Sequence, residues 1–276
     1  MIELPEAVTL GRQLDSALRG KRVAEIEAGA TPHAFAWFAG DPAAYPRFLA
    51  GKVVDASTNH GGFVELSLGD ARLLFAEGVV LRLLAPGEPR PRKHQLLVEF
   101  ADGAALSASV QMYGGLWAYL EGTFDNAYLG AARRAPSPLS AGFDHAYFER
   151  LVAAPGVQTL SAKAFLATEQ RVPGLGNGVL QDILYAARIH PRRKVATLAG
   201  AERAGLFDAL KRTLAEMTLL GGRDTERTLF GRPGDYQTRC SRQTLGTPCR
   251  RCGRGIVKEQ YLGGTVYSCP GCQPTA

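Results

Sequence analysis

Long hydrophobic runs are missing from this 276-residue sequence. No run approaches the roughly 20 apolar residues that a membrane-spanning helix needs. The first residues, MIELPEAVTL, have neither the basic start nor the apolar stretch of a secretory signal. Repeats and low-complexity segments are missing too, and 46% of the residues are hydrophobic, enough to form a buried core. We therefore expect a globular cytoplasmic protein that does not contact a membrane.

Cysteine is scarce, with five residues, but four of them stand near the end of the chain in two pairs. The spacing is C-x2-C-x16-C-x2-C, formed by Cys249, Cys252, Cys269 and Cys272. The segment between the pairs alternates apolar residues about Gly263-Gly264, which predicts a β-hairpin that brings four thiolates to one structural Zn2+. The alternative is two disulfides in a secreted protein. Cys240 has no partner in this pattern, which suits a reducing cytosol.

Positive charge is concentrated at the C-terminal end. The net charge is +6, and the last 54 residues hold nine basic against four acidic residues. A basic face beside a zinc hairpin indicates a polyanionic partner, nucleic acid first. The alternative is a solvated basic surface without a partner.

Hydrophobic periodicity divides the chain into a β part and a helical part. Residues 3–18 form an apolar stripe of helical spacing, with Ala7, Leu10, Leu14 and Leu18. Between about 21 and 130, short apolar runs alternate with turn signals such as LGD and FADG, which predicts an antiparallel β-sandwich or barrel. The pattern then becomes helical. FDHAYFERLV is a short helix, Ser161 is a candidate cap, and Leu206, Leu210, Leu214 and Met217 stripe a longer helix that ends at Gly221-Gly222.

We accordingly expect an α+β multidomain protein. Its parts are a β-sandwich domain at 1–130, a linker at 131–142, a helical domain at 143–222, a loop at 223–244 and the zinc hairpin at 245–276.

A glycine-rich turn, VPGLGNG, lies between two of the predicted helices. Gly174 and Gly176 let a ligand approach the main chain closely, and Asn177 and Gly178 open the next helix. Free N–H groups at that helix end favour a phosphate, and Asn177 can add a side-chain donor. The alternative is a helix–helix turn without a ligand.

Three stretches together resemble the formamidopyrimidine-DNA glycosylase / endonuclease VIII family: MIELPEAVTL, VPGLGNGVLQDILYAARIHPRR and the four cysteines. The resemblance implies an N-terminal helix on a two-sheet β-sandwich, a helix–two-turn–helix domain and a zinc finger, with DNA held between them. It also implies that the damaged base is flipped out of the duplex. The DNA-binding residues it implies are Gly176, Asn177, Gly178, Lys163, Gln111, Met112, Tyr113 and Arg223.

The family's catalytic residue, an N-terminal proline amine, is not matched. Ile2 occupies that position, and its nitrogen is an amide as long as Met1 is retained, hence no nucleophile. The resemblance implies a general acid/base role for Glu3 and an organising role for Glu6. Glu3 could activate water for direct hydrolysis, which needs no amine. The alternative is that both acids only favour the helix start through its dipole.

Further positions depart from the family pattern. The family's β-sandwich lysine falls near His60-Gly61-Gly62, where no lysine stands, and its finger arginine falls at Gly263 or Gly264. QMYGGLW occupies the place of the loop that fills the void of the flipped base. There Gln111, Met112 and Tyr113 are either wedge residues or core residues at a strand turn. GGRDTERTLFGRPGDYQ replaces the loop over the flipped base, and Arg223 either compensates for a missing cation or belongs to an exposed charged loop.

Two functions follow as hypotheses. The first is a base-excision-repair DNA glycosylase that uses Glu3 with water and is not an efficient β-elimination lyase. The alternative is a catalytically inert protein that binds damaged or distorted nucleic acid, with structured RNA as a third, weaker option. For the glycosylase and for the inert DNA binder, the expected partner is double-stranded, damaged DNA. We expect the protein to act as a monomer and to be associated with the nucleoid in the cytoplasm.

Overall fold

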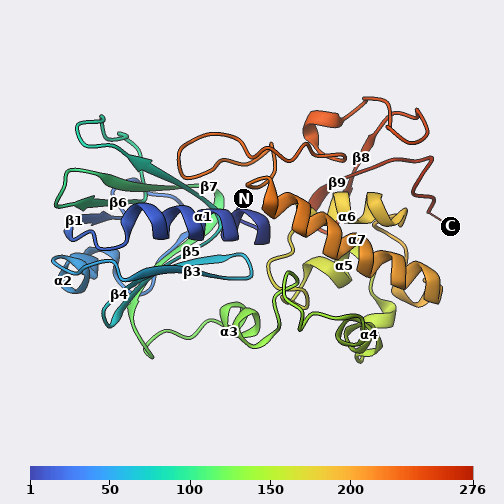
Figure 1. Ribbon diagram of the computed structural model, residues 1–276, viewed down its shortest axis with the longest axis horizontal. Coiled ribbons are helices and arrows are strands. Elements are labelled where there is room, and N and C mark those ends of the chain that lie inside the picture. Colours follow the sequence, from blue (N-terminus) through green and yellow to red (C-terminus); the bar gives the residue numbers. More distant parts are fainter. Residues whose placement is uncertain (276) are drawn as a thin grey trace.

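The computed structural model describes residues 1–275. A β-sheet region and a helical region lie side by side, and the N-terminus lies where they meet (Figure 1). Helix α1 (Leu4–Leu18) starts at this junction and runs along the sheet region (Figure 1). Within residues 1–275, no helix combines the length and the apolarity that a membrane crossing requires.

Helix α1 forms where the sequence predicts it. Pro5 stands in its first turn, and Glu6 accepts a hydrogen bond from the Glu3 backbone N–H at 3.3 Å, which satisfies a donor at the helix start. The predicted stripe is buried in the sheet core through Leu10, Leu14 and Leu18. The helix contacts β3, β4 and α7, so it joins the two regions.

Seven strands form one sheet. Their order is β1-β6-β7-β5-β4-β3, all antiparallel, with the short β2 parallel to β7. The strands are β1 (Val23–Ala28), β2 (Ala36–Trp37), β3 (Ala56–His60), β4 (Phe63–Leu68), β5 (Ala71–Leu84), β6 (Leu96–Phe100) and β7 (Ala105–Leu120). The predicted turns are confirmed, since Gly69 and Gly103 take left-handed backbone angles between β4 and β5 and between β6 and β7.

The sheet folds over its main buried core. Val98 of β6 and Leu66 of β4 belong to strands far apart in the sheet, yet both line one small apolar cavity with Leu49 of helix α2 (Tyr45–Leu49). The predicted two layers are therefore present. Their hydrogen bonding is continuous because the long strands β5 and β7 run through both.

The helical region follows the predicted order. Its helices are α3 (Ala127–Arg134), α4 (His145–Ala153), α5 (Ala162–Ala167), α6 (Val179–Ala187) and α7 (Gly200–Leu219). Short 3-10 turns occupy Val157–Thr159, Val195–Thr197 and Arg242–Thr244, and another, Pro42–Ala44, directly precedes α2. Ser161 caps α5 as predicted, accepting from the Ala164 N–H at 3.2 Å. The stripe on α7 is buried. Helix α3 occupies the first residues of the predicted linker 131–142, and the division into domains remains a prediction.

The C-terminal hairpin consists of β8 (Val257–Tyr261) and β9 (Gly264–Ser268). Its turn is Leu262-Gly263, one residue earlier than Gly263-Gly264. The hairpin packs on α6, where Tyr185 shares a buried cluster with Cys249, Ile256 and Cys269.

Candidate active site and metal centre

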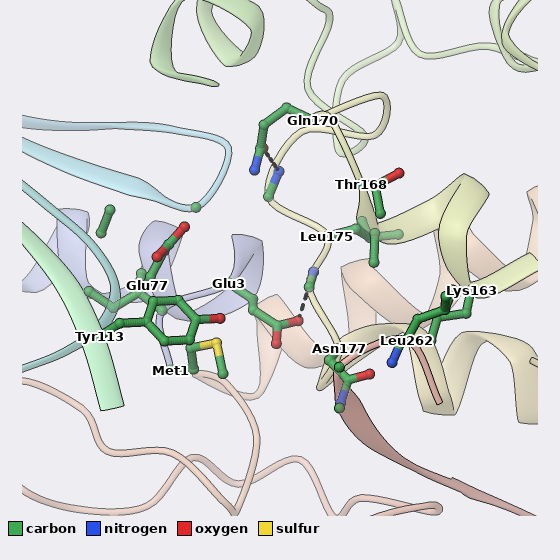
Figure 2. A pocket seen from close by; sticks show the side chains of 18 of the residues that line it. Met1, Glu3, Glu77, Tyr113, Lys163, Thr168, Gln170, Leu175, Asn177 and Leu262 are labelled. Carbon is green, nitrogen blue, oxygen red and sulfur yellow. Dashed lines mark hydrogen bonds between the residues drawn. The ribbon is translucent and has the colours of Figure 1, made fainter. Parts of the chain in front are cut away.

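A cavity of about 270 Å³ lies where the sheet, the helices and the hairpin meet (Figure 2). It is lined by residues 1–3, by Glu77 and Tyr113 of the sheet, by the turn at 174–177 and by the hairpin tip at 262–264. The structure thus brings together several residues predicted from the sequence, namely Glu3, Gly176, Asn177, Lys163 and Tyr113. Gln111 and Glu6 line a smaller cavity on the other side of Met1.

The Glu3 carboxylate is buried against the N-terminus of α6. It accepts backbone N–H groups of Gly176 at 3.1 Å and of Gly178 and Val179, both at 2.8 Å. These N–H groups and the helix dipole favour a negative charge there. Burial nevertheless raises the pKa of Glu3 above its usual value, although the charge of Arg223 and the N–H groups act to lower it. A raised pKa is what a carboxyl needs to exchange protons near neutral pH.

The N–H groups of the glycine-rich turn are therefore not free for phosphate, which corrects our expectation for Gly176 and Gly178. A Cβ at Gly176 would lie 2.8 Å from the Glu3 carboxyl carbon, and one at Gly178 would overlap the Arg223 guanidinium. Because they lack a Cβ, these glycines leave room for the side chains of Glu3 and Arg223. The sequence could not reveal this, because a helix N-terminus attracts a side-chain carboxylate and a phosphate for the same reason.

Arg223 is buried, with 3% of its surface exposed, which corrects the prediction that it contacts DNA. Its guanidinium donates to both Glu6 oxygens at 2.9 and 3.0 Å and to Glu3 at 3.4 Å. Burial acts to raise the pKa of Glu6, but the charge and hydrogen bonds of Arg223 outweigh it and hold that pKa below its usual value. Arg223 therefore forms ion pairs with both buried carboxylates, Glu3 and Glu6.

The N-terminal segment crosses the cavity wall. The Ile2 nitrogen donates to the Glu77 carbonyl at 2.5 Å, and only 5% of Ile2 is exposed. The Met1 amino group forms an ion pair with Glu226 of the loop that follows α7. In this arrangement the Ile2 nitrogen is an amide that is already hydrogen-bonded.

Sequence reasoning missed Glu77. It interrupts the apolar run LLFAEGVV in β5, has a left-handed backbone angle (φ 60°) and lines the cavity. Its Oε2 is buried without a hydrogen-bond partner, and burial raises its pKa. A lone acid in an apolar strand was the available signal, since a buried carboxyl is costly unless something pairs with it.

Residues 111–113 form a bulge in β7. Val110 pairs with Val79 and Gly114 with Glu77, so three residues of β7 stand opposite Gly78 alone. Met112 is 63% exposed and is thus no core residue, which settles that alternative. Tyr113 is half-buried and lines the cavity, where burial and the charges of Glu77 and Glu3 raise its pKa. Bulges next to active sites commonly redirect side chains in this way.

Lys163 and Asn177 connect the helices to the hairpin. Lys163 Nζ donates to the Tyr261 carbonyl at 2.5 Å, and Asn177 Nδ2 donates to the Thr265 carbonyl at 2.7 Å. These bonds lie on either side of the Leu262-Gly263 tip. Asn177 Oδ1 is buried without a partner. Gly62 lines the cavity as bare backbone.

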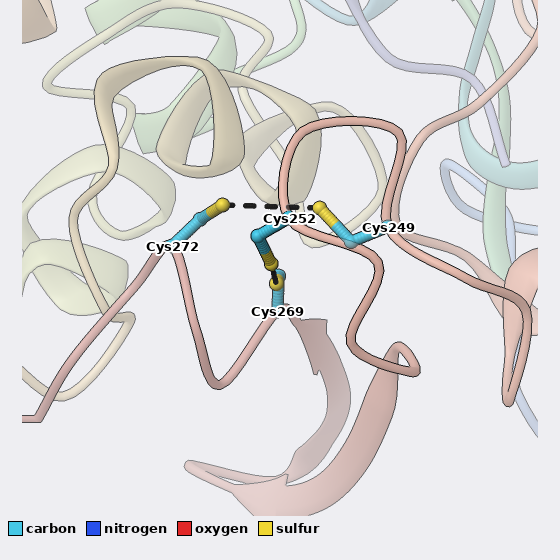
Figure 3. A group of neighbouring side chains, drawn as sticks. All are labelled: Cys249, Cys252, Cys269 and Cys272. Carbon is cyan, nitrogen blue, oxygen red and sulfur yellow. Dashed lines mark hydrogen bonds between the residues drawn. The ribbon is translucent and has the colours of Figure 1, made fainter.

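The four predicted cysteines converge (Figure 3). Their sulfur atoms all lie within 4.8 Å of one another, with 3.8 Å between Cys249 and Cys272 and 3.4 Å between Cys252 and Cys269. Four sulfurs around Zn2+ at its usual bond length would lie about 3.8 Å apart, so the group suits a tetrahedral metal ion. Cys240 is buried outside this set, where burial raises the pKa of its thiol.

Comparisons with known proteins identify the family. No family model matches the chain. A formamidopyrimidine-DNA glycosylase of Symbiobacterium thermophilum is 32% identical over 283 residues, covering 99% of this chain and 90% of that protein. One from Lactococcus lactis subsp. cremoris is 27% identical, with 99% of each chain covered.

Solved structures agree with these relatives. Lactococcus lactis Fpg in complex with abasic-site DNA has a TM-score of 0.82 and 26% identity, over 98% of this chain and 99% of that one. The same protein with DNA containing N7-benzyl-Fapy-dG has a TM-score of 0.83 and 27% identity, over 99% of each. The chain has an antiparallel sheet with a helix along it, a helical region and a four-cysteine hairpin, and an acidic cavity lies where they meet. This places it in the same fold class as these solved structures. The chain belongs to the formamidopyrimidine-DNA glycosylase family.

Proposed function

We propose that this protein is a DNA glycosylase that binds damaged double-stranded DNA and releases a base by hydrolysis. The observation that carries the proposal is the Glu3 carboxylate, which forms one wall of a cavity at the junction of sheet, helices and finger. A cavity of about 270 Å³ is near the lower end of small-molecule sites and suits one small, flat group. Membership of the family supports DNA as the partner. We propose a monomer as the acting form.

Glu3 would act as general base. It takes a proton from a water molecule whose oxygen forms a bond to the sugar C1′, while the bond from C1′ to the base nitrogen breaks. The nucleobase leaves with the electron pair of that bond and then receives the proton that Glu3 took from water, which returns Glu3 to its carboxylate form. Of the four donors to Glu3, Arg223 is the most distant, at 3.4 Å, so we propose that this contact yields to the water.

Lyase chemistry is not part of the proposal. A β-elimination lyase needs a free amine to form a Schiff base with the sugar. The Ile2 nitrogen is an amide hydrogen-bonded to Glu77, and its lone pair is delocalised. The Met1 amino group also lines the cavity, but it is held as an ammonium in an ion pair with Glu226, and an ammonium has no lone pair for attack on the sugar. We therefore propose a monofunctional enzyme.

For DNA contacts we propose Asn177 and Lys163 beside the finger, and Gln111, Met112 and Tyr113 on the bulge. Only 6% of Lys163 is exposed, but unlike Arg223 it lines the cavity. It uses one of its three donors on the finger, which leaves two for a phosphate. Met112 would occupy the space of the displaced base. Glu77 Oε2, which has no partner, would accept a hydrogen bond from an N–H group of the flipped base.

We further propose that Zn2+ is the metal of the four-cysteine site. Four thiolates leave no ligand position for water or substrate, so the ion would be structural and would hold the hairpin in shape.

An inert damaged-DNA binder is the second candidate, and one specific observation favours it. The two Glu3 oxygens accept four donors, about as many as a carboxylate has lone-pair sites. A carboxylate in that state has no free lone pair to offer a water molecule unless one contact opens. The same folded cavity could therefore bind a flipped nucleotide without cleaving it.

Base release measured separately from strand cleavage tests the two candidates. The protein is incubated with duplexes that carry a panel of oxidised bases or an abasic site, and borohydride is added to trap any Schiff base. We expect base release without trapping. Trapping at the level of a lyase would contradict the monofunctional mechanism, and no release from any lesion that binds would favour the inert binder.

Glu3→Gln and Glu25→Gln form a matched pair for this experiment. Glu25 lies exposed on β1 away from the cavity. Glu3→Gln should remove base release and keep DNA binding, because Gln cannot take a proton from water. Glu25→Gln should leave both unchanged. Equal loss in the two variants would show that the effect is not specific to the site.

A further inference from the structure

We propose that Leu262, at the tip of the finger hairpin, packs against the sugar or base of the nucleotide held in the Glu3 cavity. The inference rests on the proposed DNA-binding function and adds a contact that is apolar. Leu262 is one of the residues that line the cavity (Figure 2). Gly263 and Gly264 line it as well, and 57% of Leu262 is exposed.

The backbone at the tip is unfavourable for leucine. Tyr261 pairs with Gly264, so Leu262 and Gly263 form a two-residue turn, with φ angles of 48° and 70°. A turn with both central residues left-handed prefers Asn-Gly, Asp-Gly or Gly-Gly. A non-glycine residue in this region costs about 1 kcal/mol or more. Folding of the hairpin alone therefore gives no reason for leucine at this position.

The tip is also held in place. Lys163 bonds the Tyr261 carbonyl on one side of the turn, and Asn177 bonds the Thr265 carbonyl on the other. Both donors come from the helical region, whose turn at 174–177 also lines the cavity. Leu262 is thus fixed at the cavity mouth before any ligand arrives, and contacts on a rigid element lose little conformational entropy on binding.

The chemistry of the side chain selects the part of DNA it touches. An isobutyl group neither donates to a phosphate nor neutralises its charge, whereas the carbon face of a deoxyribose or the ring face of a base offers apolar area. Binding energy from Leu262 should therefore be independent of salt, because counterion release accompanies phosphate contacts only.

Leu262→Asn tests the inference, because turn stability and ligand contact predict opposite effects. Asn suits the left-handed turn, so the thermal unfolding temperature should stay the same or rise. Binding is followed by fluorescence anisotropy on a duplex with a stable abasic-site analogue and, in the Glu3→Gln background, on a duplex with an oxidised base. Affinity should weaken about fivefold on at least one of the two duplexes, since roughly half a leucine side chain would lose its contact. The slope of log affinity against log salt should not change.

Two further variants sharpen the test. Leu262→Met keeps an apolar side chain in the same strained turn and should retain affinity close to that of the wild type. Val257→Thr removes apolar surface from the same hairpin at a site that is 43% exposed and does not line the cavity, so it should bind normally.

The outcomes are distinct. Unchanged affinity of Leu262→Asn, with the wild type binding, would overturn the Leu262 contact and leave the proposed function standing. A lower unfolding temperature or a changed salt slope would also contradict the inference. Failure of the wild type to bind any damaged duplex would instead overturn the proposed DNA-binding function.

Discussion

On the Glu3 side of the cavity the carboxylate oxygens accept four donors, whereas on the finger side Asn177 Oδ1 is buried with none. The Glu3 side is charged and closed by Arg223. The finger side has backbone carbonyls, glycines and an exposed leucine in a strained turn. Sites that bind ligands often keep unpaired polar groups and strain, because the ligand supplies the missing contacts. We therefore expect DNA binding to depend first on the finger side, and base hydrolysis to require that the Arg223 contact to Glu3 opens first.

Removal of the metal should have the largest effect of all, and this effect should be confined to the finger side. Zn2+ contributes on the order of 10 kcal/mol or more to folding in small zinc domains, so a chelator should unfold residues 245–275 and leave the sheet region folded. Hydrogen exchange of the two regions would measure this. Cys269→Ser should reproduce the effect, and Cys240→Ala, outside the ligand set, should not. Loss of protection throughout the sheet would contradict this separation.

Arg223→Ala should have the next largest effect, now on the Glu3 side. It leaves two buried carboxylates without a counter-charge, so the free energy of unfolding at pH 7 should fall by about 3–5 kcal/mol. Urea denaturation would measure it. Arg227→Ala, in the same loop but exposed, should change it by less than about 0.5 kcal/mol.

The dependence of the unfolding free energy on pH provides a second test of the Arg223 ion pairs. In the wild type the folded pKa of Glu6 is lowered, so its contribution is present above its ordinary value of 4.5 and is lost as the pH falls through the folded pKa. Without Arg223, burial should raise that pKa, and protonation would then favour the folded state. The stability gap between wild type and Arg223→Ala should narrow as the pH falls from 7 to 5, and a constant gap would contradict the ion pair.

Asn177→Ala should weaken DNA binding by roughly 1–3 kcal/mol, the range for a hydrogen bond to a charged group. Anisotropy at fixed salt would measure it, with the exposed Gln243→Ala as control. Unchanged affinity would mean that Asn177 serves only to hold the finger through Thr265.

Met112→Ala should give the smallest effect. Since Met112 is 63% exposed, its loss should change the free energy of unfolding by less than about 0.5 kcal/mol. Affinity for a duplex with an abasic site should fall by about 1 kcal/mol, while an intact duplex should bind as before. Equal weakening on both duplexes would show a general contact in place of a wedge.

Local patterns in the sequence predicted much of this fold. The two cysteine pairs, the helix stripes and the strand turns at Gly69 and Gly103 depend on neighbours a few residues apart, and each is confirmed. The turn of the C-terminal hairpin is one residue earlier than predicted. The pairing of Glu3 with Gly178 and of Arg223 with Glu6 joins residues 175 and 217 positions apart. Arg223 occurs in a loop of alternating charge, and an exposed and a buried arginine give the same local pattern there. Only the folded chain separates them.

The Glu3 contact also bears on how the chain is made. Residue 3 leaves the ribosome long before the N–H groups of Gly176, Gly178 and Val179 exist. During that interval the sheet region can fold with its carboxylate hydrated, at no cost in unpaired charge. The carboxylate is desolvated only when the helical region docks. The Glu3 contacts therefore stabilise the docking of the folded sheet region onto the folded helical region, and they contribute little to the earlier folding of either region.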